Sequence, residues 1–118
     1  MITAKKALSS IGAGALVGIG IAAVLVPFCF FAAGFGHGTY APMIACFPFT
    51  MLGAAAIGRI SAALIVLGVL QFPAYGAVVG WSRAKARSVP VFAALAVVHV
   101  IVGAAAAFVA EKGGNFLP

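Results

Sequence analysis

The most constraining feature of this chain is that its charged residues are confined to short islands between long apolar runs. Hydrophobic residues make up 65% of the 118 positions and charged residues only 7%, and the mean hydropathy is +1.27. A soluble domain is about one quarter charged, so this composition is typical of a protein whose solvent is the bilayer. We predict an all-α integral membrane protein, because helices satisfy their own backbone hydrogen bonds in lipid.

Four apolar runs divide the chain, at about residues 9–33, 43–58, 60–81 and 90–110. A spanning helix needs about 20 apolar residues, so the chain has room for one polytopic domain with short connections. We expect a bundle of four transmembrane helices. The alternative is three spanning helices plus one re-entrant segment, because the second run has only 16 residues and Pro48 interrupts it.

The positive-inside rule weighs these two topologies. With four helices, the two sides carry four and three basic residues, and this near-zero bias predicts insertion in both orientations. With three helices the division is five against two: Lys5, Lys6, Arg83, Lys85 and Arg87 against Arg59 and Lys112. Length favours four helices, because 16 residues form about 24 Å of helix, which nearly crosses a thin bilayer.

The first run predicts the location of the protein. Lys5 and Lys6 resemble the start of a signal peptide, but the apolar run after them, residues 7–33, is too long for the apolar core of one. We therefore expect an uncleaved first span and a multi-pass protein of a cell membrane, specifically a bacterial inner membrane.

The charge balance predicts the partners. The formal net charge is +6, with Glu111 as the single acidic residue. Because the basic residues stand at the edges of apolar runs, we expect Arg83, Lys85 and Arg87 to bind anionic lipid headgroups. Nucleic acid is not an expected partner, since no basic face with interleaved aromatic residues appears.

Small residues recur at four-residue spacing in three of the runs. In lipid, such residues let two helix backbones approach closely, and that approach supplies the attraction between helices. We expect these faces to pack within the chain, or between the subunits of a homo-oligomer or larger membrane complex. The predicted packing residues are Gly14, Gly18, Gly76, Gly80 and Gly103.

Polar residues in and beside the apolar runs form the candidate polar site, because an unsatisfied polar group is costly in lipid. They are His37, Tyr40, Arg59, Gln71, Tyr75 and His99. Gln71 and Tyr75 lie one helical turn apart and share a face. No carboxylate lies inside a run, so a proton- or sodium-coupled antiporter is not expected.

Two prolines, Pro48 and Pro73, interrupt apolar runs in the two halves of the chain. Paired interrupted spans are a sequence indication of a binding site in transporters. The alternative is two ordinary kinks, which membrane helices tolerate.

The cysteines and histidines allow little further chemistry. Cys29 and Cys46 flank a glycine-rich connection and could form a disulfide, but two free buried thiols are favoured because both lie inside apolar runs. No metal-site spacing appears. Two histidines, His37 and His99, could in principle bind a haem, but we expect no cofactor.

Three functions follow, in order of preference. No nucleophile–base pair, phosphate loop or carboxylate pair is present, so we do not expect an enzyme. The first hypothesis is an accessory subunit or partner-binding module that acts by helix packing. The alternative is a small oligomeric channel or carrier for a small or anionic solute. The third is a redox membrane subunit that binds haem.

Overall fold

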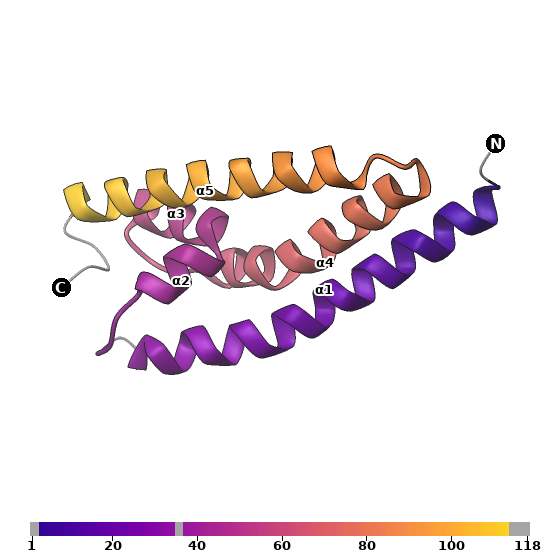
Figure 1. Cartoon of the computed structure of the whole chain (residues 1–118). Helices are drawn as coiled ribbons and strands as arrows, with labels where there is room; N and C mark the ends of the chain where they lie inside the picture. Colours follow the sequence, from indigo (N-terminus) through magenta and orange to yellow (C-terminus); the bar gives the residue numbers. More distant parts are fainter. Residues whose placement is uncertain (1–2, 35–36, 114–118) are drawn as a thin grey trace.

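The computed structural model describes residues 3–34 and 37–113, and every regular element among them is an α-helix. Three helices are long and apolar enough to cross a membrane: α1 (Ala4–Ala32), α4 (Ala62–Ala84) and α5 (Ser88–Gly113). The molecule is 52 Å long (Figure 1), slightly more than the ~40–45 Å thickness of a bilayer with its headgroups. The prediction of an all-α chain is confirmed, and its three membrane-length helices agree with a membrane location.

The second apolar run forms two short helices, α2 (Ala41–Cys46) and α3 (Pro48–Ile57), instead of one span. They are separated at Phe47, whose backbone has φ −127° and ψ 57°. Pro48 has no N–H to continue the α2 ladder and suits the first turn of α3. Neither helix has the length of a crossing, so the prediction of four spanning helices is not confirmed.

The α2–α3 pair is a hairpin that enters and leaves at the same end of the molecule. Figure 1 shows α2 running inward from the end where α1 stops, and α3 running back to that end before α4 begins. Gly58 ends α3 in the left-handed conformation (φ +73°), which a glycine adopts without steric cost. Ser61 then caps α4 by accepting a hydrogen bond from the Leu64 N–H at 3.4 Å.

The long helices extend beyond the predicted apolar runs. Helix α1 begins at Ala4 instead of residue 9, and α4 continues to Ala84, past the end of its predicted apolar run at residue 81. The actual turn is residues 85–87, where the N–H groups of Lys85 and Arg87 donate to the Ser82 carbonyl at 3.0 and 2.9 Å. Hydropathy shows how far the apolar side chains extend, whereas backbone hydrogen bonds can continue a helix through polar residues beyond them.

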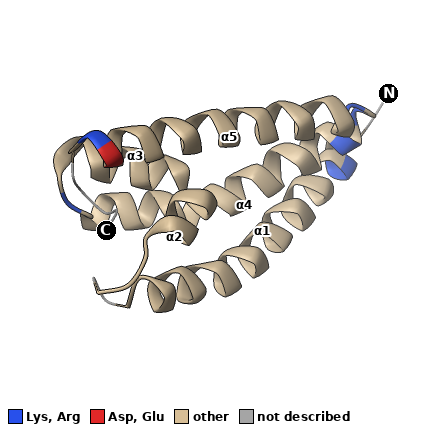
Figure 2. Ribbon diagram, turned by 60° about the vertical axis from the view of Figure 1, so that its left-hand side comes forward, with Lys and Arg blue, Asp and Glu red and all other residues tan. Residues whose placement is uncertain are grey.

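The helices form two main packing contacts, and the contact between α1 and α4 is more extensive than the contact between α5 and the hairpin. Helices α1 and α4 lie against each other along their length, whereas α5 packs mainly on α3. The most buried cluster surrounds the hairpin and contains Cys29, Met43, Ile44, Phe47, Met51 and Ala106. Charges gather at the two ends (Figure 2), with the residue 3–6 segment and the α4–α5 turn at one end and Arg59, Glu111 and Lys112 at the other.

Candidate functional site

The site begins with the backbone break at Phe47, which leaves carbonyl groups of the last α2 residues without helical partners. A non-helical backbone at membrane depth is tolerated only where protein or water satisfies its polar groups. The carbonyl oxygens of Ala45 and Cys46 accept hydrogen bonds from side chains of α5 and α4. The break therefore draws polar side chains from two other helices to one point.

His99 is the bridge between the hairpin and α4. It is the twelfth residue of α5, about 17 Å from the start of that helix. Its Nε2 lies 2.7 Å from the Ala45 carbonyl oxygen, and its Nδ1 lies 3.2 Å from the Tyr75 hydroxyl oxygen. A carbonyl can only accept, so Nε2 carries the proton, and in the neutral ring Nδ1 accepts from Tyr75.

Gln71 makes the second polar contact with the break. Its Nε2 donates to the Cys46 carbonyl oxygen at 3.0 Å. The side chain is only 6% exposed, and its Oε1 is buried without a hydrogen-bond partner. Buried acceptors are almost always satisfied by protein or ordered water, so this oxygen is an exception among the described residues.

Aromatic rings flank this polar cluster. Phe72 contacts Phe47 edge-to-face with ring centroids 5.5 Å apart, and it lies 6.1 Å from the ring of Tyr75. The Tyr75 and His99 rings are 5.8 Å apart. These rings lie beside the polar cluster on α4, whereas the hydrogen bond between His99 and the Ala45 carbonyl is at an exposed position.

The hairpin is also attached to α4 by Thr50. The Thr50 hydroxyl donates to the Leu64 carbonyl oxygen at 2.9 Å. Gly68 makes room for it, because a Cβ at this position would lie 2.8 Å from the Thr50 Oγ1. A glycine is therefore required here by close approach.

The six residues of the predicted polar site fall into two groups. The structure brings Gln71, Tyr75 and His99 together, since they form the hydrogen-bonded cluster just described. His37 and Tyr40 lie in the connection before α2, and Arg59 lies in the turn after α3, at the end of the molecule. Of that connection, residues 35–36 lie outside the described part.

Four of the five predicted packing glycines line the contact between α1 and α4. A Cβ added at Gly14 would overlap the Gly76 carbonyl oxygen, and one added at Gly18 would overlap the Phe72 carbonyl oxygen. Gly80 faces the Ser10 carbonyl in the same way. The contact is within the chain, a point that the spacing alone left open.

Gly103 lies elsewhere. A Cβ there would be 3.7 Å from the Cβ of Pro48, which is ordinary van der Waals contact. This glycine therefore faces the start of α3 rather than α1 or α4.

The two cysteines are free thiols; both were predicted to be buried, but Cys46 is only partly buried. Cys29 is buried in α1, and its thiol faces that of Cys46 at the end of α2. His37 lies in an end connection, whereas both ring nitrogens of His99 lie within hydrogen-bond distance of partners. Among the described residues, no group of three or more His, Cys, Asp or Glu residues could hold a metal.

The predicted headgroup-binding residues Arg83, Lys85 and Arg87 are exposed at the end of α4 and in the α4–α5 turn. The Lys85 Nζ lies 4.0 Å from the centre of the Trp81 ring, a cation–π geometry. Tryptophan and basic residues together are typical of the membrane–water interface.

Sequence reasoning missed the backbone carbonyls of Ala45 and Cys46. Pro48 was the available signal for the carbonyls, since a proline frees acceptors in the preceding turn, although Ile44 is the residue to which that rule points. Thr50 lies two residues after this proline; its polarity inside an apolar run is a signal, although it was not included in the candidate polar site. No protein family, curated protein or solved structure matches this chain.

Proposed function

We propose that the chain crosses the membrane three times and that α2–α3 is a re-entrant hairpin. The two hairpin helices have 6 and 10 residues, well short of the ~20 that a crossing requires. Three crossings also divide the basic residues five against two, which satisfies the positive-inside rule. The end with Lys5, Lys6 and the α4–α5 turn is then cytoplasmic.

Cysteine labelling in intact cells tests this topology. In a chain with Cys29→Ser and Cys46→Ser, new cysteines are introduced singly as Thr39→Cys, Arg59→Cys and Lys85→Cys. With a re-entrant hairpin, Thr39→Cys and Arg59→Cys react with an impermeant maleimide from the same side, and Lys85→Cys from the other. If Arg59→Cys and Lys85→Cys reacted from one side of the membrane and Thr39→Cys from the other, neither topology would fit. If Thr39→Cys and Lys85→Cys reacted from one side of the membrane and Arg59→Cys from the other, the chain would cross the membrane four times.

For the activity, we infer a small channel or carrier whose solute site lies at the hairpin tip. One observation supports this most: an interrupted helix places carbonyls at mid-depth, where His99 and Gln71 meet them. Interrupted helices that present backbone groups near the bilayer midplane are the usual construction of transporter sites. A helix that only had to span the membrane would need no such break.

The glycine faces also favour this function over a partner-binding module. Gly14 and Gly76 contact each other inside the chain, so they are already occupied. The four-residue spacing of these glycines suggested a contact with a partner protein, but in the structure it serves the contact between α1 and α4 of the same chain.

The chemistry of the cluster favours an uncharged polar solute. Its side chains are an amide, a phenol and an imidazole, and among the described residues near it no carboxylate or basic group could balance a bare ion. A charge without a partner is costly in a low-dielectric site. The buried Gln71 Oε1 has no hydrogen-bond partner among the described residues and can only accept, so the solute should carry an N–H or O–H group.

Swelling of proteoliposomes under osmotic gradients of urea or glycerol tests the activity, with sodium nitrate as the charged comparison. The purified full chain should accelerate entry of a neutral solute over protein-free vesicles. Gln71→Met should remove most of that acceleration, since it keeps the volume and deletes both hydrogen-bonding groups. The matched control is Ser82→Ala, because Ser82 is buried in the same helix but bonds only to the Val79 carbonyl.

The results separate cleanly. Equal rates for wild type and protein-free vesicles with every solute would contradict a channel or carrier, as would a Gln71→Met variant that conducts like wild type. Faster nitrate than urea entry would show an anion pathway and overturn the neutral-solute assignment.

A further inference from the structure

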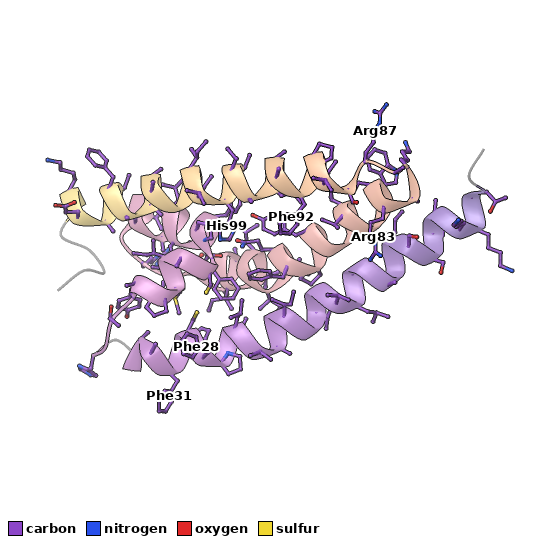
Figure 3. All side chains as sticks on the ribbon, viewed as in Figure 1. Phe28, Phe31, Arg83, Arg87, Phe92 and His99 are labelled. Atoms are coloured by element: carbon purple, nitrogen blue, oxygen red, sulfur yellow. The ribbon has the colours of Figure 1, made fainter. Side chains whose placement is uncertain are left out.

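A groove opens between α1 and α4 at the basic end of the molecule. It has a volume of about 480 Å³ and is lined by small residues together with Lys6, Ser10 and Arg83. Figure 3 shows Arg83 at the edge between α4 and α1, while Arg87 points away from the helices. The charged residues of this lining, Lys6 and Arg83, are both basic and both exposed.

The groove continues toward the middle of the molecule as an apolar channel between α1, α4 and α5. This second part has a volume of about 430 Å³ and shares Val17, Gly76 and Val79 with the first. It is lined almost entirely by apolar side chains, and Tyr75 and His99 are its polar members. In Figure 3, Phe92 and His99 point from α5 toward α4 over this space.

The packing explains why the groove is open. Helix α5 packs mainly on α3, which occupies only the half of the molecule that holds the hairpin. The first half of α5 therefore has no helix pressed against it from that side. The glycines at the α1–α4 contact add no side chains that could fill the space.

The dimensions match one lipid chain in one leaflet. Phe72 and Arg83 are both in the groove lining and are 11 residues apart along α4, about 17 Å of helix. Half of the ~30 Å hydrocarbon core is about 15 Å. A basic mouth at the headgroup level above an apolar channel of this depth complements an amphiphile with an anionic head.

We propose that this groove binds one anionic phospholipid, with its phosphate between Lys6 and Arg83 and one acyl chain along α4 toward Tyr75 and His99. Arginine and lysine are the usual binders of phosphate. A second copy in the same orientation is a poorer occupant, since the chain has only one acidic residue, Glu111, which lies at the opposite end. This binding does not depend on the proposed solute activity.

Native mass spectrometry of the full chain in detergent tests the proposal, with phosphatidylglycerol and phosphatidylcholine supplied together. Wild type should retain one phosphatidylglycerol in preference to phosphatidylcholine. Lys6→Gln with Arg83→Gln should reduce that preference about tenfold or more, since each basic residue near a surface contributes measurably to anionic-lipid binding. The control, Lys85→Gln with Arg87→Gln, removes the same charge outside the groove and should keep the preference.

A second pair of variants tests the acyl channel. Ala96→Trp fills the apolar part of the groove and should abolish retention, whereas Ala94→Trp, on α5 outside the lining, should leave it unchanged. Equal losses in the two charge pairs would overturn the proposal in favour of general surface attraction. Retention unaffected by Ala96→Trp, or displacement by inorganic phosphate alone, would overturn it in favour of a headgroup or free-anion site.

Discussion

Helix α1 meets α4 through backbone atoms, whereas the α2–α3 hairpin meets α5 and α4 through side-chain hydrogen bonds. In the first contact, Gly14 and Gly76 have no side chains, so each lies directly against the other's carbonyl. In the second contact, His99 and Gln71 reach across to the carbonyls of the broken helix.

The difference shows two solutions to one problem. Lipid is as apolar as leucine, so burying apolar surface gives helices no reason to associate. Continuous helices with satisfied backbones associate through close van der Waals contact. An interrupted helix has unsatisfied carbonyls and must be stabilised by donors from its neighbours. The first kind of contact should therefore be most sensitive to added volume, and the second to the loss of a hydrogen-bond donor.

The largest effect should come from adding volume to the backbone contact. Gly14→Leu drives a side chain into the Gly76 carbonyl and should cost about 3 kcal/mol in the free energy of unfolding, the upper part of the range for overpacking. Unfolding by SDS in mixed micelles measures this loss. Gly12→Leu is the matched control, because a Cβ at Gly12 meets nothing within 4 Å. Equal stability of the two variants would contradict the packing described for α1 and α4.

An intermediate effect should come from removing a donor at the hairpin. His99→Ala leaves the exposed Ala45 carbonyl without its partner, and an acceptor that loses its partner in lipid, where no water replaces it, costs about 1–3 kcal/mol. The Cys46 thiol should also react faster with maleimide, because the hairpin tip is no longer held. His37→Ala, in the end connection, should change neither quantity. If Cys46 reacts at the wild-type rate in His99→Ala, the imidazole does not hold the hairpin.

The smallest effect should come from Gly68, where the two kinds of contact meet. Gly68→Ala places a Cβ against the Thr50 hydroxyl oxygen and should destabilise the chain by about 1 kcal/mol. Thr50→Ala removes that oxygen, so the double variant should lose less stability than the two single variants together. A double-mutant cycle in the same unfolding assay measures the coupling, and strict additivity would mean that the hydroxyl is not the obstacle.

The fold could be predicted from the sequence as far as local signals reach. The apolar runs identify α1, α4 and α5, because hydropathy is a property of each segment alone. Pro48 marks the break between α2 and α3, yet the run around it has a length between a span and a re-entrant segment. Only the direction of the chain after Phe47 distinguishes these topologies, and that direction depends on contacts with other helices.

The candidate site was predicted in part. Polarity inside an apolar run singled out Gln71, Tyr75 and His99, which do lie together. The same rule also selected His37 and Arg59, which lie in connections, because polarity by itself does not distinguish a buried site from an end. The carbonyl acceptors escaped notice, since every residue has one and only the folded backbone decides which are left unpaired.

The sequence by itself determined that this chain is helical and suited to lipid, that its basic residues stand at the edges of apolar runs, and which helix faces carry glycine. These properties follow from composition and from the 3.6-residue period of a helix. The tertiary structure decided that the glycine faces of α1 and α4 meet each other and that α3 turns back. It also decided that His99 and Gln71 satisfy the broken helix. The physical reason is that a helix presents a face without specifying its partner, and partners are chosen only when all unpaired backbone groups and surfaces are satisfied together.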